Sequence, residues 1–397
     1  MRLEELVERA RRALDKPSRF GYDIDVHRFL SIEPSPSGIE QALTKARSVG
    51  IDDSRISLLA VQLNRRIELL KALHPGVEAM PLEQAIDERW DEIKDYLWRA
   101  IEVDRDRYTA AVQLYGSGGL YVRIKRGTRV ELPLQLCFML TGGAQLVHSI
   151  VVVEPKSEVT IVTGCSIMTE ALGLHVGVTE IFVEEEAKVV DIMVHSWTRT
   201  AHARPRTGVV LGDDDRYVGY YINLSSVETV QGEFTVNAKG DRASAKLVAI
   251  LLGLERSTHD IYDEAKLIGE ESSAEVLSRV VARDSSRIVT RAYIEGASRR
   301  SRGYIECNAL LLSPTATVTT VPSLEAKSMD SELHHEASIG RLREEEIEYL
   351  IMRGFTEREA ISILIRGFLE VDTEELPQHI AKSVEHVLDI VAQRSVA

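Results

Sequence analysis

The stretches "SSRIVTRAYI" (residues 285–294) and "TATVTTVPSL" (residues 315–324) share one plan, a short polar turn followed by alternating apolar and polar residues. Alternation with a period of two is typical of a β-strand that buries one face. Ile288 and Val318 occupy the same place in the two stretches and lie 30 residues apart (318 minus 288). This part of the chain therefore predicts strands that recur at a fixed interval.

The same turn-and-strand unit recurs from about residue 108 to residue 335. Further examples are "VELPLQLCFML" (130–140), "KSEVTIVTG" (156–164), "EAKVVDIMV" (186–194) and "RASAKLVAI" (242–250). Val130, Val159 and Val189 lie 29 and 30 residues apart. Such a period favours a β-helix, in which stacked coils bury their inner faces against one another. A β-sandwich would give the alternation without the period, and it stays the alternative at this point.

Both ends of the chain have the spacing of helices. The N-terminal segments "MRLEELVERARRALDK", "GIEQALTKARSVG" (38–50) and "PLEQAIDERWDEIKDYLWRAIEV" (81–103) carry apolar residues three and four apart, so residues 1–103 are predicted to be helical. After Gly340, "LREEEIEYLIMRG" and "FTEREAISILIRGF" predict two short helices joined at Gly354, the second opened by a capping box of Thr356 and Glu359. We expect an N-terminal helical region (1–105), a β core (106–338) and a C-terminal helical region (339–397).

Composition excludes several classes of protein. The 397 residues are 44% hydrophobic and 28% charged, and no apolar run approaches the roughly 18 residues of a membrane span. The net charge of -14 disfavours nucleic acid as a partner. No GxxxxGK[ST] phosphate loop occurs, so we expect no nucleotide hydrolysis by this chain.

The charged N-terminus and the odd number of cysteines, three, predict a cytoplasmic protein with reduced thiols.

One segment combines a thiol, an imidazole and a carboxylate. Cys307 lies on a predicted strand, and His335 and Glu336 follow one coil later, since 335 minus 307 is 28. Thiolate and imidazole suit iron, and a carboxylate can complete such a ligand set. The alternative is an ordinary buried cysteine beside a polar turn.

Cys165 follows Gly164 at a predicted strand end, where another protein's cysteine could reach it, or it is a core residue at a turn. Cys137 is given no role. The remaining histidines lack the spacing of metal ligands, and we expect them to be structural or exposed; they include His148, His175, His195, His202 and His259.

Several motifs resemble the SufB/SufD family of iron-sulfur cluster assembly scaffolds. The segment "DRYTAAVQLYGSGGLYVRIKRGTRVELPLQLCF" (106–138), the cysteine segment "VTGCSIM", the tryptophan segment "HSWTR" and the C-terminal "HHEASIGRLREEEIEYLIMRGFTEREAISILIRGF" carry this resemblance. Together they span about residues 106–377. The sequence departs from the family around Cys165, with Thr163 two residues before it and "SIM" after it.

The resemblance implies a mainly β fold, a right-handed parallel β-helix flanked by helical regions. It implies that the chain is an assembly scaffold and not an enzyme, with ATPase activity in a partner of the SufC type. Cys165 would accept persulfide sulfur, and Cys307, His335 and Glu336 would hold a transient iron-sulfur cluster. The SufC partner would dock on the C-terminal helices, at Tyr349, Arg353, Gly354, Phe355, Ile361, Leu364 and Phe368.

The resemblance further implies a second SufB/SufD-type subunit, as a homodimer or a heterodimer, and a sulfur-donor protein. A reduced flavin is compatible with the family, but no motif in the sequence indicates one. The presence of Cys307 and of Glu336 after the histidine favours a SufB-like chain. The alternatives are a SufD-like structural partner without ligands of its own and, more distantly, a β-helix enzyme acting on polysaccharide.

Overall fold

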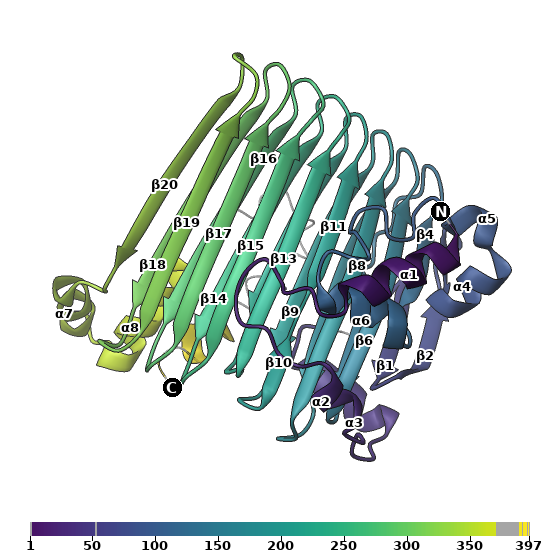
Figure 1. Cartoon of the computed structure of the whole chain (residues 1–397). Helices are drawn as coiled ribbons and strands as arrows, with labels where there is room; N and C mark the ends of the chain where they lie inside the picture. The colour runs from purple at the N-terminus through teal and green to yellow at the C-terminus, as the bar shows by residue number, and fades with distance from the viewer. Residues whose placement is uncertain (1, 52–53, 371–388, 391, 395, 397) are drawn as a thin grey trace.

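The computed structural model describes residues 2–51, 54–370, 389–390, 392–394 and 396. The chain folds as a parallel β-helix of about eight turns with helices toward both termini, so the β-helix prediction is confirmed (Figure 1). The described helices are α1 (Leu3–Ala13), α2 (His27–Leu30), α3 (Ile39–Arg47), α4 (Leu82–Glu88), α5 (Trp90–Ile93), α6 (Arg107–Tyr115), α7 (Glu344–Met352) and α8 (Glu357–Phe368). The described strands are β1 (Leu58–Leu63), β2 (Arg66–Ala72), β3 (Val77–Pro81), β4 (Leu120–Ile124), β5 (Leu134–Leu140), β6 (Gly143–Val153), β7 (Glu158–Ile167), β8 (Gly173–Val183), β9 (Lys188–Ser196), β10 (Ala201–Ala203), β11 (Arg206–Leu211), β12 (Arg216–Asn223), β13 (Thr229–Ala238), β14 (Ser244–Gly253), β15 (Thr258–Leu267), β16 (Ser273–Ala282), β17 (Arg287–Gly296), β18 (Arg302–Leu311), β19 (Thr317–Ala326) and β20 (Glu332–Gly340).

Each coil contributes one strand to each of two long sheets. Sheet A has the order β2-β1-β5-β7-β9-β12-β14-β16-β18-β20, and sheet B has the order β19-β17-β15-β13-β10-β8-β6-β4-β3, with β11 paired to β8 and β13. Val159 pairs with Val189, and Ile288 pairs with Val318, so the interval read from the sequence is the register of the coils. The parallel pairing continues to the strands β19 and β20, which end the two sheets (Figure 1).

The turns between coils repeat a residue with left-handed backbone conformation. These residues have φ between 57° and 62° and recur every 28 to 30 residues, at Lys156, Glu186, Asp214, Arg242, Glu271 and Arg300. Non-glycine residues rarely adopt this conformation. Hydrogen bonds between coils hold it: the N–H of Lys156 donates to Glu185 O at 3.0 Å, and the N–H of Glu186 donates to Asp213 O at 2.9 Å. The ladder between coils therefore continues through the turns.

Within the part of the chain that the structure describes, three apolar clusters stabilise the fold. One fills the inside of the coils with side chains from both sheets. The second lies on the outer face of sheet A and includes Ala42 of α3 and Ile365 of α8. The third lies on the outer face of sheet B and includes Leu6 of α1 and Tyr108 of α6. The terminal helices thus cover the outer faces of the β-helix, which would otherwise expose apolar side chains.

The helical prediction for residues 1–103 is wrong in part. Residues 58–81 form β1, β2 and β3; β1 pairs with β5, and β3 pairs with β4, so the β core begins well before residue 106. The periodic segment 81–103 gives only the short helices α4 and α5. The reason is tertiary: Arg89 leaves the helical conformation (φ −129°, ψ 34°), and the buried Glu180 carboxylate accepts the backbone N–H groups of residues 98–101 at 2.6–3.1 Å. This carboxylate offers the backbone an alternative to helical hydrogen bonds.

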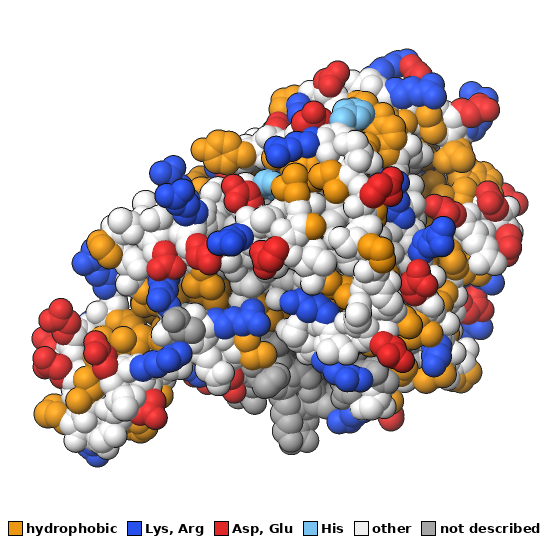
Figure 2. All heavy atoms as spheres, turned by 90° about the horizontal axis from the view of Figure 1, so that it is seen from below, with side chains coloured by type: hydrophobic (Ala, Val, Ile, Leu, Met, Phe, Trp, Pro, Cys, Tyr) orange, Lys and Arg blue, Asp and Glu red, His pale blue; other side chains and the backbone are white. Residues whose placement is uncertain are grey.

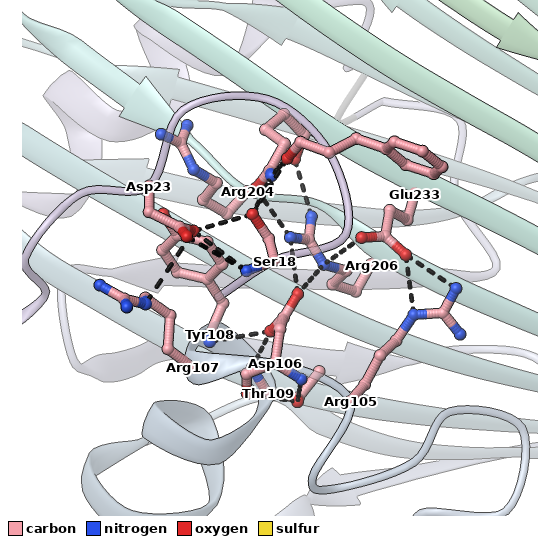
Figure 3. A network of polar contacts seen from close by, with 12 residues as sticks. Ser18, Asp23, Arg105, Asp106, Arg107, Tyr108, Thr109, Arg204, Arg206 and Glu233 are labelled. Carbon is pink, nitrogen blue, oxygen red and sulfur yellow. Dashed lines mark hydrogen bonds and ion pairs between the residues drawn. The ribbon is translucent and has the colours of Figure 1, made fainter. Parts of the chain in front are cut away.

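A buried polar network fastens the N-terminal region to sheet B (Figure 3). Asp106 caps α6, and its Oδ2 accepts hydrogen bonds from Nε and Nη2 of Arg206 at 3.0 and 2.9 Å. Both side chains are 1% exposed. Beside them Arg105 pairs with Glu233 at 2.7 Å. The residues come from segments about 100 positions apart, so the network fixes how the N-terminal region sits on the coils.

The C-terminal hairpin has the predicted form. Glu344, Glu345 and Glu346 lie in the first turn of α7. Gly354 has a φ of 100° after α7, and the capping box of Thr356 and Glu359 opens α8. The rest of the predicted C-terminal helical region, residues 371–388, lies outside the described residues. Among the described helices, none combines the length and the apolar character needed to cross a membrane.

Candidate functional site

Cys307 lies in the middle of β18 and points into the coils. Its neighbours on the same face of the strand, Ile305 and Ala309, belong to the interior cluster. Its in-register partners are Ser278 on β16 and Ala337 on β20. The side chain is 1% exposed, and burial is the main cause that raises the pKa of its thiol. Metal binding needs the thiolate, so this cysteine must lose a proton before it can act as a ligand.

His335 and Glu336 lie on β20, the last strand of sheet A. His335 pairs with Ile305, and Glu336 pairs with Glu306. Because side chains alternate along a strand, His335 shares the inner face with Cys307, whereas Glu336 shares the outer face with Glu306. The coil spacing here is 30 residues and not 28, so His335 is a diagonal neighbour of Cys307, with Cα atoms about 8 Å apart.

The three residues of the predicted ligand set are therefore brought to one end of the β-helix but not to one point. His335 and Glu336 are exposed, while Cys307 is buried. Among the described residues, no three His, Cys, Asp or Glu side chains are grouped closely enough to hold a metal ion. A complete ligand set would need a change at β20 or further ligands from outside the described residues.

Cys165 lies near the end of β7, inside the coils, and is 1% exposed. It pairs with Phe138 on β5 and with His195 on β9. Burial, followed by the nearby Cys137 and Asp191, raises the pKa of the thiol well above its ordinary value. The predicted surface position at a strand end is not what the structure shows, because β7 continues to Ile167 and the thiol faces inward. Cys137 belongs to the apolar cluster on the outer face of sheet A.

A few polar side chains face the otherwise apolar interior between the two cysteines. His195 pairs with Cys165, and its Nδ1 lies 3.1 Å from the hydroxyl of Tyr221. Tyr221 is in register, strand by strand, with Ala249, Ser278 and Cys307. Cys165 on β7 and Cys307 on β18 are five strand spacings apart, about 24 Å along the β-helix axis. The thiols thus share one interior but cannot touch.

Two carboxylates face the same interior. Burial raises the pKa of Asp263 to about 7, and its charge acts on both Tyr221 and Cys307. Burial likewise raises the pKa of Asp191 to about 7, and this carboxylate accepts a hydrogen bond from Tyr217 at 3.2 Å. Both groups can exchange a proton near neutral pH, which apolar core residues cannot do.

Some interior polar atoms near Cys165 lack a partner among the described residues. They are Nε2 of His195 and Nε1 of Trp197, whose rings lie 5.1 Å apart. Unpaired buried polar atoms cost free energy, so such atoms indicate an interior suited to a polar guest. The sequence prediction treated His195 as an ordinary structural or surface residue. The alternation of side chains along the strand could have placed His195 inside. It lies six residues, an even number, after Val189, whose side chain belongs to the interior cluster, so both side chains point to the same face.

The predicted docking residues fall into two groups. Tyr349 and Phe355 are 51% and 41% exposed, and Arg353 stacks on the Tyr349 ring with its guanidinium carbon 5.0 Å from the centroid. By contrast, Ile361 and Phe368 of α8 pack on the apolar cluster over sheet A. Figure 2 shows acidic and hydrophobic side chains gathered at the end of the molecule that carries this hairpin. The free surface is thus the α7 side of the hairpin with its Gly354 turn.

Comparison with known proteins shows which family the chain belongs to. The profile of the family described as "SUF system FeS cluster assembly, SufBD core domain" matches residues 138–368, more than half of the chain. The chain belongs to the SufBD family. It is 34% identical to an iron-sulfur cluster assembly SufBD family protein of Methanothermobacter thermautotrophicus, an alignment that covers 98% of both chains. A SufBD family protein of Archaeoglobus fulgidus is 33% identical over 91% of this chain and 97% of its own.

The SufBD family also includes a relative with a more specific name. The iron-sulfur cluster assembly protein SufB of Bacillus subtilis is 22% identical to this chain over 81% of its length and 70% of the relative. The matched SufBD core contains both interior cysteines, His335, Glu336 and the C-terminal hairpin. The sites singled out in the sequence thus all lie within the part that defines the family.

Proposed function

We propose that this SufBD protein is a scaffold subunit of the SUF system, on which sulfur and iron are assembled into a nascent iron-sulfur cluster. The observation that carries the proposal is the position of Cys307. Its thiol faces the interior on β18, the last strand but one of sheet A. His335 lies diagonally across from it on β20, the last strand. Thiolate and imidazole are established ligands for iron-sulfur clusters. Here the cluster is the cargo of the protein.

The open end of the β-helix is the proposed assembly interface. β19 and β20 end their sheets, so each has one edge without a neighbouring strand in the described chain. Unpaired edges favour pairing with another chain, and Val321 and Ile339 add exposed apolar surface there, at 41% and 44%. A second SufB/SufD-type subunit, identical or homologous, would pair here and supply further ligands. Pairing would also turn β20, so that Glu336 could join Cys307 and His335.

The presence of a second interior thiol, Cys165, is the basis for a sulfur route that begins there. A donor protein would bring a persulfide, and the receiving thiolate would attack its outer sulfur. A new S–S bond forms, and the donor cysteine leaves as a thiolate. Exchange onto Cys307 would need a thiol carrier or a rearrangement that bridges the two cysteines, because they lie about 24 Å apart along the β-helix. Reduction of that sulfur to sulfide takes two electrons from a reductant outside this chain, for which a reduced flavin is chemically suited.

The exposed part of the C-terminal hairpin supports docking of a SufC-type ATPase. Tyr349, Arg353 and Phe355 present an aromatic and cationic surface around the Gly354 turn. Aromatic and arginine side chains are typical anchors of protein interfaces. ATP hydrolysis in the partner would move the hairpin and change the pairing at the open end, while this chain itself hydrolyses nothing.

Anaerobic reconstitution with iron and sulfide tests the proposal. We expect the wild type, alone and with SufC, to bind iron and to show sulfide-to-iron charge-transfer absorption. Cys307→Ser should lose both, whereas Cys137→Ser, the same change at a cysteine outside the interior, should keep them. Equal iron in wild type and Cys307→Ser, or iron in neither, would instead assign the chain as a SufD-like partner without ligands of its own.

A further inference from the structure

A small cavity lies inside the β-helix, between β9, β12, β13, β14 and β15. It measures about 10 Å³, the space of a single water molecule. Four polar side chains line it from the inner faces of the two sheets: Asp191, Tyr217, Tyr221 and Asp263. The cavity therefore offers one small guest two carboxylates and two phenol oxygens within a largely apolar interior.

Asp263 differs from the other buried carboxylates of the described residues because it has no polar partner. It is 5% exposed and shares the inner face of β15 with Ile261 and Ala265. No hydrogen bond or ion pair joins its carboxylate to another described residue, and burial is what raises its pKa. The other buried carboxylates each have such a partner; they are Asp106, Glu180, Asp191, Asp215, Glu233, Asp260 and Glu264. An unpaired buried carboxylate costs free energy, so Asp263 either keeps a proton or needs a positively charged guest.

The charge around the cavity fits a guest with a single positive charge. One unpaired carboxylate balances one such charge, since Asp191 already accepts a hydrogen bond from Tyr217 at 3.2 Å. The hydroxyl of Tyr221 lies 3.1 Å from Nδ1 of His195, and a phenol oxygen keeps lone pairs for a further contact. Oxygen atoms of this kind are the ligands that hard cations prefer.

The size of the cavity favours a potassium ion. Mg²⁺ dehydrates reluctantly and keeps several waters, for which a space of one water molecule leaves no room. K⁺ is about as large as a water molecule and exchanges its hydration shell for protein oxygens. We propose that the cavity binds one monovalent cation of the size of K⁺, held mainly by Asp263 and completed by Asp191, Tyr217 and Tyr221. The inference stands apart from cluster assembly, because no residue of the proposed cluster ligand set takes part.

Thermal unfolding of the full-length protein at pH 8 tests this inference. The pKa of Asp263 is about 7, so this pH keeps most of its carboxylate ionised. The probes are KCl, NaCl and choline chloride at equal ionic strength, which removes general screening from the comparison. We expect the melting temperature to be highest in KCl and to rise with KCl concentration, as for a ligand that binds only the folded chain. Equal melting temperatures in KCl and choline chloride would overturn the inference, and a larger effect of NaCl would overturn the assignment to an ion of this size.

Asp263→Asn keeps the shape of the side chain and removes its charge. The variant should fold, because it removes an unpaired buried charge, and it should need at least about tenfold more KCl for the same rise. Tyr221→Phe keeps the ring, loses one oxygen and should also weaken the response. Asp330→Asn, at an aspartate whose side chain is 57% exposed, should respond as the wild type does. An undiminished KCl response in Asp263→Asn would overturn the site. Cluster formation is not a readout, so failure of the proposed function would leave this result unaffected.

Discussion

Cys307 on β18 and His335 on β20 lie on the same face of neighbouring strands but two residues out of register, since Cys307 pairs with Ala337 and His335 pairs with Ile305. Glu336, one residue further on, faces the opposite side. The single chain therefore presents a thiol and an imidazole together and holds the carboxylate apart. In the proposed scaffold, a second subunit has to change this arrangement before a cluster is complete.

The separation of the two faces predicts different results for two neighbouring substitutions. In the isolated protein, His335→Ala should lower the iron bound after anaerobic reconstitution, whereas Glu336→Ala should have little effect, because its carboxylate faces away from Cys307. In the assembled complex with SufC and a second subunit, both variants should bind less iron. Iron quantification and visible absorption provide the measurement. A loss in Glu336→Ala as large as that in His335→Ala in the isolated chain would contradict the arrangement.

Burial of the thiols predicts slow and ordered alkylation. Cys137, Cys165 and Cys307 are all buried, and burial raises the pKa of both Cys165 and Cys307. We expect native protein to react with iodoacetamide far more slowly than unfolded protein, and Cys307 to react before Cys165 because it lies one strand from the open end. Mass spectrometry of peptides after timed labelling measures this order. Cys165 reacting first would instead indicate direct access to it from the surface.

Asp263 predicts a dependence of stability on pH. Its pKa is about 7 in the folded chain, against an ordinary value of 3.8. Between these values the folded chain holds a proton that the unfolded chain has lost, so raising the pH through this window lowers the free energy of unfolding. Asp263→Asn should remove the effect. We expect the variant to be more stable than the wild type at pH 8, on the order of a few kcal/mol, and similar to it at about pH 4, close to the ordinary pKa of 3.8.

Denaturant unfolding at the two pH values measures this difference. Burial also lowers the pKa of His175 to about 3 and of His259 to about 4, so these groups destabilise the fold as the pH falls below their ordinary value of 6.5. They are present in both proteins and cancel in the comparison. Identical pH profiles for the wild type and Asp263→Asn would show that the carboxylate is not buried in solution.

Two arginine–aspartate pairs of the chain should differ greatly in their effect on stability. Arg206 and Asp106 are each 1% exposed, so Arg206→Met leaves a buried carboxylate without its partner and should cost about 3–5 kcal/mol. Arg242 and Asp214 are 53% and 43% exposed, so Arg242→Met should cost less than about 1 kcal/mol. Urea unfolding midpoints compare the two variants. Equal losses would mean that the network of Figure 3 does not fasten the N-terminal region.

The C-terminal hairpin predicts a separation of binding from folding. Phe355→Ala removes a side chain that is 41% exposed, so it should weaken binding to SufC by about tenfold or more, as at an interface anchor, without lowering the melting temperature. Ile365→Ala removes a fully buried side chain, so it should lower the free energy of unfolding by about 2–5 kcal/mol and with it the melting temperature. Surface plasmon resonance with immobilised SufC and thermal unfolding give the two readings. Unchanged affinity in Phe355→Ala would place the docking surface elsewhere.

The sequence by itself determined the repeat. The spacing of Val159 and Val189, and of Ile288 and Val318, became the register of the coils, because stacked parallel strands require equal lengths of chain per turn. The sequence also determined the C-terminal hairpin, because local signals set its ends: Gly354 follows α7, and the capping box of Thr356 opens α8. Both features depend on short-range geometry, which a sequence states directly.

Only the tertiary structure decided which residues meet. Residues 58–81 became strands because β1 and β3 add to sheets made by later segments. The helix expected over residues 81–103 ends early, because the buried Glu180 carboxylate binds the backbone N–H groups of residues 98–101. A shift of two residues in register moved His335 from beside Cys307 to its diagonal, and strand alternation sent Glu336 to the other face. The register of each strand, and the face to which each side chain points, depend on the length of every turn between the strands. The residues of the site could therefore be named from the sequence, whereas their relative positions could not.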